Sequence, residues 1–169
     1  MPLAEELLDH ASRLLKSPDT EADLRRAVSA SYYAVFHLLS AAVASQVSPP
    51  TPLGMSGRLQ RLLKHREMKN AMESFRTKDS CATLSANIGI HCAFSPDLAE
   101  IAKAYGDLQD ARHLADYDVV DSGGAVGLAW ASNSFDKAKR IFEAWDRAKT
   151  TDEARLFLAT LIFGTKWAK

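Results

Sequence analysis

Apolar residues recur every three or four positions along most of the chain, which is the spacing of a helix with one buried face. This spacing predicts helices at residues 2–16, 20–45 and 56–73. Residues 46–57 contain three prolines and two glycines and predict a loop between the second and third helices. Residues 80–95 carry no charge and hold scattered Ser and Thr with a glycine, so we expect an irregular segment there.

Three further helices are predicted from their capping residues. Ser95-Pro96 is a strong helix start, and the fourth helix runs from there to about Asp116. Asp121-Ser122 caps a fifth helix, and Thr150-Thr151-Asp152-Glu153 forms a capping box, with Glu three residues after Thr, that opens a short last helix. Nothing in the chain reads as a β-strand. The pattern therefore predicts an all-α fold, an antiparallel bundle of five to six helices.

The composition is that of one globular domain over residues 1–169. With 47% hydrophobic and 25% charged residues, the chain is long enough to bury a core without disulfides. Two cysteines and the absence of an N-terminal leader pattern lead us to expect a cytoplasmic protein. Cys81, His91 and Cys92 do not have zinc-ligand spacing, and no phosphate-binding glycine loop is present. We therefore expect neither a metal nor a cofactor.

Charge is segregated along the sequence although the formal net charge is zero. Residues 58–79 hold seven Lys and Arg against three Asp and Glu, whereas residues 97–121 hold two against seven. A protein without net positive charge lacks the field that duplex nucleic acid binding through phosphates requires, so any such binding must be local. The segregation fits either pairing within the chain or a basic surface that faces RNA or a partner protein.

The second predicted helix lies in a stretch without a single Asp, Glu, Lys or Arg, from Ala27 to Gly57. A membrane span is disfavoured, because the segment carries many Ser, Tyr, His and Gln side chains and no second span exists to pair with them. A helix without charge on any face is instead expected to be enclosed all round, in the centre of a bundle or partly by a second subunit. This is a first indication of a homodimer.

Two short stretches concentrate residues that carry chemistry. In the second helix, Tyr33 and His37 lie four residues apart on one face. Paired tyrosines in an alanine-rich helix are most often core residues whose hydroxyls reach a neighbouring helix. In the fourth helix, Arg112 and Asp116 have the spacing of an ion pair, among a cluster of other acidic residues that favours perturbed protonation.

The combination of these two stretches resembles the HEPN domain superfamily. The carrying residues are the run Asp23-Leu24-Arg25-Arg26-Ala27-Val28-Ser29-Ala30-Ser31-Tyr32-Tyr33-Ala34-Val35-Phe36-His37, and the later Arg112-His113-Leu114-Ala115-Asp116-Tyr117-Asp118. The likeness is to an uncharacterised branch with Ala-Tyr-Tyr-Ala-x-Phe-His and Arg-x-x-Ala-Asp-Tyr motifs, and it covers about residues 20–147. It implies a helical bundle that dimerises along the motif-bearing helices. Many members are metal-independent ribonucleases or toxins, often paired with a minimal nucleotidyltransferase as antitoxin.

The family's active motif, an Arg followed by a polar residue and then a His a few positions on, maps onto this chain with one departure. Arg112 is the motif arginine and His113 the polar residue, but Tyr117 stands where the His is expected. A tyrosine with a pKa near 10 is a poor base at neutral pH, so His113 and His37 are the alternative bases. The candidate catalytic residues are Arg112, His113, Tyr117 and His37. The candidate substrate-binding residues are Arg25, Arg26, Tyr33 and Asp116.

Three functional hypotheses follow. The first is a HEPN-fold component of a toxin–antitoxin or stress-response system that binds RNA or nucleotide around Arg112, without a membrane, and pairs with a nucleotidyltransferase. The second is a metal-independent endoribonuclease that uses Arg112 with a nearby His. The third is a non-catalytic helical interaction module in which these arginines and tyrosines are purely structural.

Overall fold

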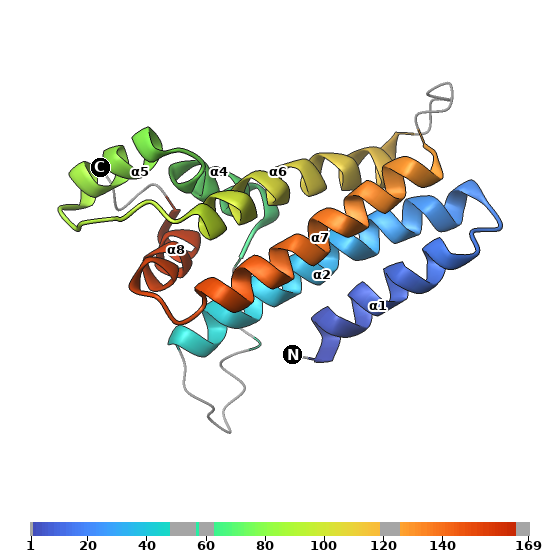
Figure 1. Cartoon of the computed structure of the whole chain (residues 1–169), viewed down its shortest axis with the longest axis horizontal. Helices are drawn as coiled ribbons and strands as arrows, with labels where there is room; N and C mark the ends of the chain where they lie inside the picture. Colours follow the sequence, from blue (N-terminus) through green and yellow to red (C-terminus); the bar gives the residue numbers. More distant parts are fainter. Residues whose placement is uncertain (1, 48–56, 58–62, 119–125, 165–169) are drawn as a thin grey trace. The chain divides into compact units, whose positions relative to one another are not determined.

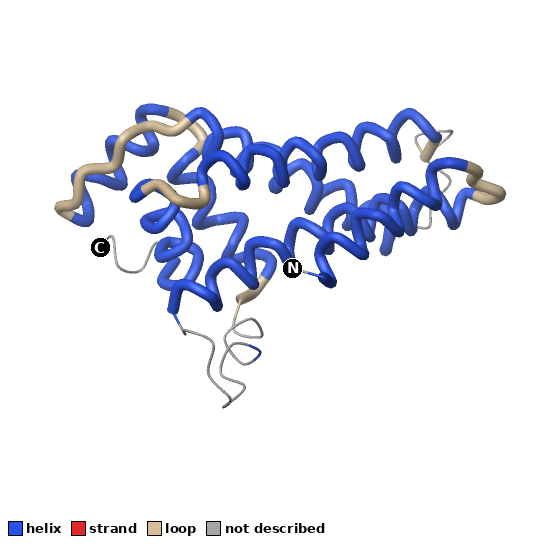
Figure 2. Tube along the Cα trace, turned by 60° about the horizontal axis from the view of Figure 1, so that its bottom comes forward, coloured by secondary structure: helices blue, strands red, loops and turns tan. Residues whose placement is uncertain are grey.

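All described secondary structure in the chain is helical (Figures 1 and 2). The structure, a computed structural model, describes residues 2–47, 57, 63–118 and 126–164. The α-helices and one 3-10 helix are α1 (Pro2–Lys16), α2 (Glu21–Val47), α4 (His65–Met72), η1 (Glu73–Phe75), α5 (Lys78–Ile88), α6 (Pro96–Tyr117), α7 (Leu128–Ala148) and α8 (Asp152–Phe163). The prediction of an all-α fold is confirmed, and the bounds of α1, α2 and α6 agree with the predicted ones within two residues.

The expectation of an irregular segment at residues 80–95 is wrong for its first half, which belongs to α5. Thr77 caps this helix by accepting a hydrogen bond from the Ser80 N–H, and Gly89 ends it with a φ of 67°. Its many Ser and Thr residues have low helix propensity, but burial of Cys81 and Leu84 on one face compensates for this. Because of α5, the described residues contain seven α-helices rather than five to six.

Two helix starts also differ from the sequence patterns. The N-cap of α8 is Thr151, whose hydroxyl accepts from the Ala154 N–H, so the capping residue lies one position after the predicted Thr150. The predicted cap at Asp121-Ser122 lies outside the described residues, and α7 begins at Leu128. The helix predicted at 56–73 is described from His65 as α4, followed by η1.

The chain divides into two compact units. Unit 1 consists of Met1–Leu38 and Ala104–Phe142, and unit 2 of Leu39–Lys103 and Glu143–Lys169. Helices α2, α6 and α7 each contribute residues to both units. The single domain expected over residues 1–169 stays a prediction.

Unit 1 is built from α1 and from parts of α2, α6 and α7, which lie side by side (Figures 1 and 2). Residues from all four helices share one apolar cluster, formed by Val28, Ala115 and Ala131 with Leu15, Leu24, Ala111 and Trp130 packed against them. Ala131 of α7 shares this cluster with Ala115 of α6. Lys137, later in α7, pairs at 2.7 Å with Asp107, which is earlier in α6. Helices α6 and α7 are therefore antiparallel.

Helix α2 is enclosed nearly all round, as its lack of charge predicts. No residue from 27 to 44 is exposed. The helix is long and apolar enough to cross a membrane by length and composition, and 78% of its most apolar window is buried in the protein. A buried core helix has the same composition, so the length and composition of α2 favour neither a membrane span nor a core helix.

A pair of buried tyrosines joins α2 to α6 within unit 1. The hydroxyl oxygens of Tyr32 and Tyr105 lie 3.0 Å apart, and both side chains are fully buried. Burial raises the pKa of Tyr32 to about 12 and raises that of Tyr105 well above its ordinary value. Both rings are therefore held as neutral phenols, and the sequence expectation of a core tyrosine that reaches a neighbouring helix is confirmed for Tyr32.

Unit 2 packs α4 and η1 against α8. The rings of Phe75 and Phe157 meet edge to face with centroids 5.1 Å apart. Cys81 and Cys92 are both buried free thiols, and the Cys81 Sγ donates to the Cys92 carbonyl oxygen at 3.5 Å. Burial raises the pKa of the Cys92 thiol to about 12, so it stays protonated at neutral pH.

The buried tyrosine pair makes unit 1 sensitive to alkali. Because the folded-state pKa values lie above the unfolded value near 10, their contribution to stability is complete below pH 10 and is lost as the pH rises above it. Each tyrosine should add a slope of up to about 1.4 kcal/mol per pH unit. We expect the free energy of unfolding, measured in urea by circular dichroism from pH 8 to 11.5, to fall less steeply in Tyr32→Phe/Tyr105→Phe. Parallel curves for the two proteins would contradict this account.

Candidate functional site

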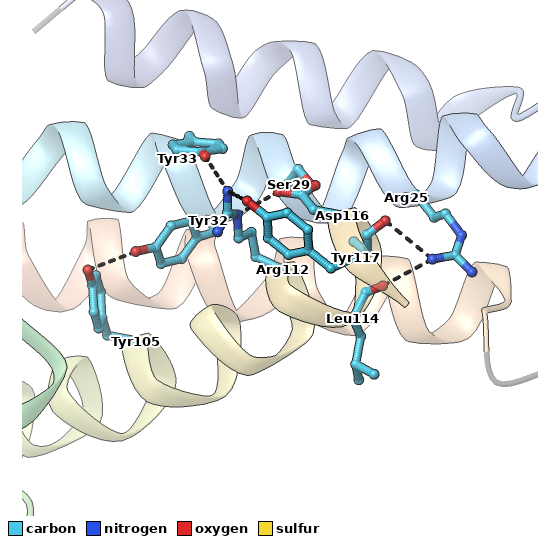
Figure 3. Close-up of polar contacts among 10 residues, drawn as sticks. Arg25, Ser29, Tyr32, Tyr33, Tyr105, Arg112, Leu114, Asp116 and Tyr117 are labelled. Atoms are coloured by element: carbon cyan, nitrogen blue, oxygen red, sulfur yellow. Dashed lines mark hydrogen bonds and ion pairs between the residues drawn. The ribbon is translucent and has the colours of Figure 1, made fainter. Parts of the chain in front are cut away.

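The guanidinium of Arg112 is the centre of a polar cluster between α2 and α6 in unit 1 (Figure 3). Its Nη2 donates to the hydroxyl of Tyr33 at 2.7 Å and approaches that of Tyr117 at 3.4 Å. The central carbon of the guanidinium lies 5.3 Å from the Tyr33 ring centre and 5.2 Å from that of Tyr117. Both distances suit a cation–π contact, so two aromatic rings and two hydroxyls define the position of the cation.

Asp116 pairs with this arginine and anchors it to α2. Its Oδ2 lies 2.6 Å from the Arg112 Nε, as the spacing in the sequence predicted, although this N–H does not point along the contact. The other carboxylate oxygen accepts from the Ser29 hydroxyl at 2.5 Å. The side chains of Arg112 and Asp116 are 18% and 27% exposed. Burial opposes the charge on Arg112, but Tyr33 and Asp116 outweigh it, so the pKa of Arg112 is raised.

Arg25 binds the C-terminal end of α6. Its Nη1 donates to the carbonyl oxygen of Leu114 at 3.0 Å (Figure 3) and to those of Ala115 and Asp118 at 3.2 and 2.9 Å. Its Nε pairs with Glu21 at 2.7 Å. Carbonyls in the last turn of a helix have no partner within the helix, and a cation there is favourable to the helix dipole. The last turn of α6 has no basic residue of its own, so Arg25 supplies this charge from α2.

A pocket of about 550 Å³ lies beside the Arg112 cluster, entirely within unit 1. Helix α1 contributes one residue to it, α2 contributes six and α6 contributes two. The lining residues are His10, Ala22, Arg25, Arg26, Ser29, Ala30, Tyr33, Ala115 and Asp116. Ser29, Tyr33 and Asp116 thus belong to the wall of the pocket and to the cluster that holds Arg112.

Neither of the two candidate histidines, His113 and His37, is a member of the arginine cluster. His113 is exposed, and its ring centre lies 5.2 Å from that of Tyr117, so it reaches the cluster only through this tyrosine. His37 is half-buried with its ring edge-on to Phe36, and it does not line the pocket. Burial lowers the pKa of His37, which favours its neutral form. Among the described residues, no group of three or more His, Cys, Asp or Glu side chains is arranged to hold a metal ion.

Six of the eight candidate residues therefore form the cluster or line the pocket, and a seventh, His113, contacts the cluster through Tyr117. Arg112, Tyr33, Asp116 and Tyr117 form the cluster, and Arg25 and Arg26 line the pocket. Sequence reasoning missed Ser29 and His10. Ser29 lies four residues before Tyr33 on the same helical face, which is a signal the sequence contains. No spacing relates His10 on α1 to the two motifs.

Comparison of the chain with known proteins found no match. No protein-family model, no curated protein and no solved structure matches the chain. The interpretation of the site consequently depends on the residues and contacts described above.

Arg25 and Arg26 provide a matched test of the helix-end contact. We expect Arg25→Ala to lower the free energy of unfolding by about 2 kcal/mol, because the α6 carbonyls lose a charged donor. Arg26→Ala, next in sequence and exposed, should change it by no more than about 0.5 kcal/mol. Urea unfolding followed by circular dichroism measures both, and equal costs for the two variants would refute the assignment.

Proposed function

We propose that this chain is a HEPN-fold protein that binds RNA or a nucleotide around Arg112. It acts in the cytoplasm as a homodimer, in a toxin–antitoxin or stress-response setting with a minimal nucleotidyltransferase as partner protein. The observation that carries the binding role is the guanidinium of Arg112 held between the rings of Tyr33 and Tyr117. The partner and the setting follow from the resemblance in sequence.

The arginine cluster has the chemistry of a single-strand binding site. Tyr117 is 60% exposed, so much of its side chain is accessible to a base that stacks on it. The Nη2 of Arg112 donates to neutral hydroxyl oxygens, which hold a guanidinium less strongly than an anionic phosphate oxygen does. A phosphate that approaches from the Tyr117 side can therefore replace a tyrosine hydroxyl at a favourable free energy.

The relation between the two sequence motifs supports the resemblance. Tyr33 and Arg112 are 79 residues apart in sequence, yet they share a hydrogen bond of 2.7 Å. Ser29 and Asp116 are 87 residues apart and share another. The HEPN resemblance depends on one motif in the second predicted helix and one in the fourth, and both helices contribute to this cluster.

A homodimer along α2 is supported by the surface of that helix. Ser29, Tyr33, Phe36 and His37 lie at helical spacing on one face, and each is only half-buried although the stretch has no charge. Tyr and Phe are enriched where two subunits meet. A second copy of the chain would cover the remaining apolar area of this face.

The binding proposal is tested with a fluorescently labelled single-stranded RNA and fluorescence anisotropy. We expect Arg112→Ala to weaken binding by about tenfold or more, since one charge-assisted contact and the support of both tyrosines are lost. Arg140→Ala, which removes an exposed cation from α7, is the charge-matched control and should weaken binding little. Equal losses in the two variants, or no binding by the parent protein, would reject the proposal. The second of these results, together with a lower unfolding free energy for Arg112→Ala, is the result expected of a purely structural module.

A second candidate function is metal-independent cleavage of RNA. It is supported by the exposed His113, whose ring packs on Tyr117 at the edge of the arginine cluster. A histidine can take the proton of a ribose 2′-hydroxyl, and the Arg112 guanidinium can stabilise the charge that develops on the phosphate. We expect cleavage in excess chelator to fall at least about a hundredfold in Arg112→Ala and His113→Ala. If His37→Ala alone abolishes cleavage, His37 is the base, and undiminished cleavage in every variant would identify a contaminating nuclease.

A further inference from the structure

The pocket beside the Arg112 cluster is lined by groups of different charge. Arg25, Arg26 and His10 are cationic or hydrogen-bond donors, whereas Asp116 is anionic and Ser29 and Tyr33 are neutral. Its volume of about 550 Å³ lies in the range of pockets for small ligands. One nucleotide fits such a volume.

Of the two arginines that line the pocket, Arg26 is the one whose charge is available to a ligand. Arg25 is engaged by three carbonyls of α6 and by Glu21. Arg26 is exposed, and no hydrogen bond or ion pair joins its side chain to another residue within the described part of the chain; its charge acts on the carboxylate of Asp23. The Asp23 carboxylate already accepts hydrogen bonds from the backbone of Asp19 and Thr20 and from the Thr20 hydroxyl.

Two further features favour an anion beside Arg26. His10 supplies a ring N–H from α1, a different helix, so donor groups line the pocket from two helices. Ala22, which also lines the pocket, lies in the first turn of α2, where the helix dipole is positive. Asp116, from α6, repels an anion but accepts hydrogen bonds from hydroxyl or amino groups.

We propose that this pocket binds the terminal phosphate of a nucleotide or of an RNA end, with Arg26 and His10 as its ligands and the sugar or base directed toward Tyr33 and Asp116. The inference rests on the proposed function, because it extends the same ligand from the Arg112 cluster into the neighbouring pocket. A phosphomonoester carries more charge than an internal phosphodiester, and the exposed Arg26 guanidinium distinguishes the two through that charge. The site then recognises the end of a chain or a free nucleotide.

The test compares ligands that differ only in the terminal phosphate. Anisotropy is measured for one labelled RNA 12-mer with a 5′-phosphate, with a 3′-phosphate or with hydroxyls at both ends. One phosphorylated form should bind about tenfold more tightly than the hydroxyl form. Arg26→Ala and His10→Ala should reduce this ratio toward one, while Arg140→Ala retains it. Competition by 5′-AMP but not by adenosine distinguishes a free nucleotide from an RNA end as the source of the phosphate.

Each outcome separates this inference from the proposed function. If RNA binds with an affinity that depends on Arg112 but not on the terminal phosphate, the pocket inference is wrong and the proposed function stands. If 5′-AMP binds through Arg26 while no RNA binds, the pocket inference holds and RNA is excluded as the ligand. Absence of binding by every ligand overturns both. Arg26→Ala must unfold at the same urea concentration as the parent protein, which guards against loss of the fold as the cause.

Discussion

The pairing of α2 with α6 depends on one constraint, that polar groups removed from water must find partners in the neighbouring helix. The Tyr32 hydroxyl meets Tyr105, the Ser29 hydroxyl meets Asp116, and the Arg25 guanidinium meets the end carbonyls of α6. These contacts lie along the whole shared length of the two helices within unit 1. A shift of one helical turn would break all of them at once, so the polar contacts define the register that apolar packing alone leaves loose.

This constraint also gives Arg112 its chemical character. A guanidinium in this half-buried position needs a counter-charge, and Asp116 provides it while Ser29 keeps the carboxylate in place. The cation is thus positioned before any ligand arrives, and little side-chain entropy is lost when one binds. An incoming phosphate must compete with the Asp116 carboxylate, because the Nε side of Arg112 is already paired with it.

Sequence patterns predicted the parts of the fold that follow from local periodicity. Helices α1 and α2 follow from their apolar spacing and α6 from its Ser95-Pro96 start, and the Arg112–Asp116 pair follows from their separation of four residues. The α5 helix was missed, because its stability comes from tertiary burial of Cys81 and Leu84 rather than from propensity. The long-range contacts of Tyr33 and Arg25 were not predictable from spacing, since they depend on how α2 and α6 are aligned.

The two kinds of contact at the site differ in how they constrain changes of sequence during evolution. Arg25 binds main-chain carbonyls, so positions 114, 115 and 118 can change their side chains without loss of this anchor. Ser29 with Asp116 and Tyr33 with Arg112 are side-chain pairs, and a change in one partner leaves the other without its match. Covariation should therefore be confined to these two pairs, while positions 114 and 118 are free to change in sequence around a fixed arginine.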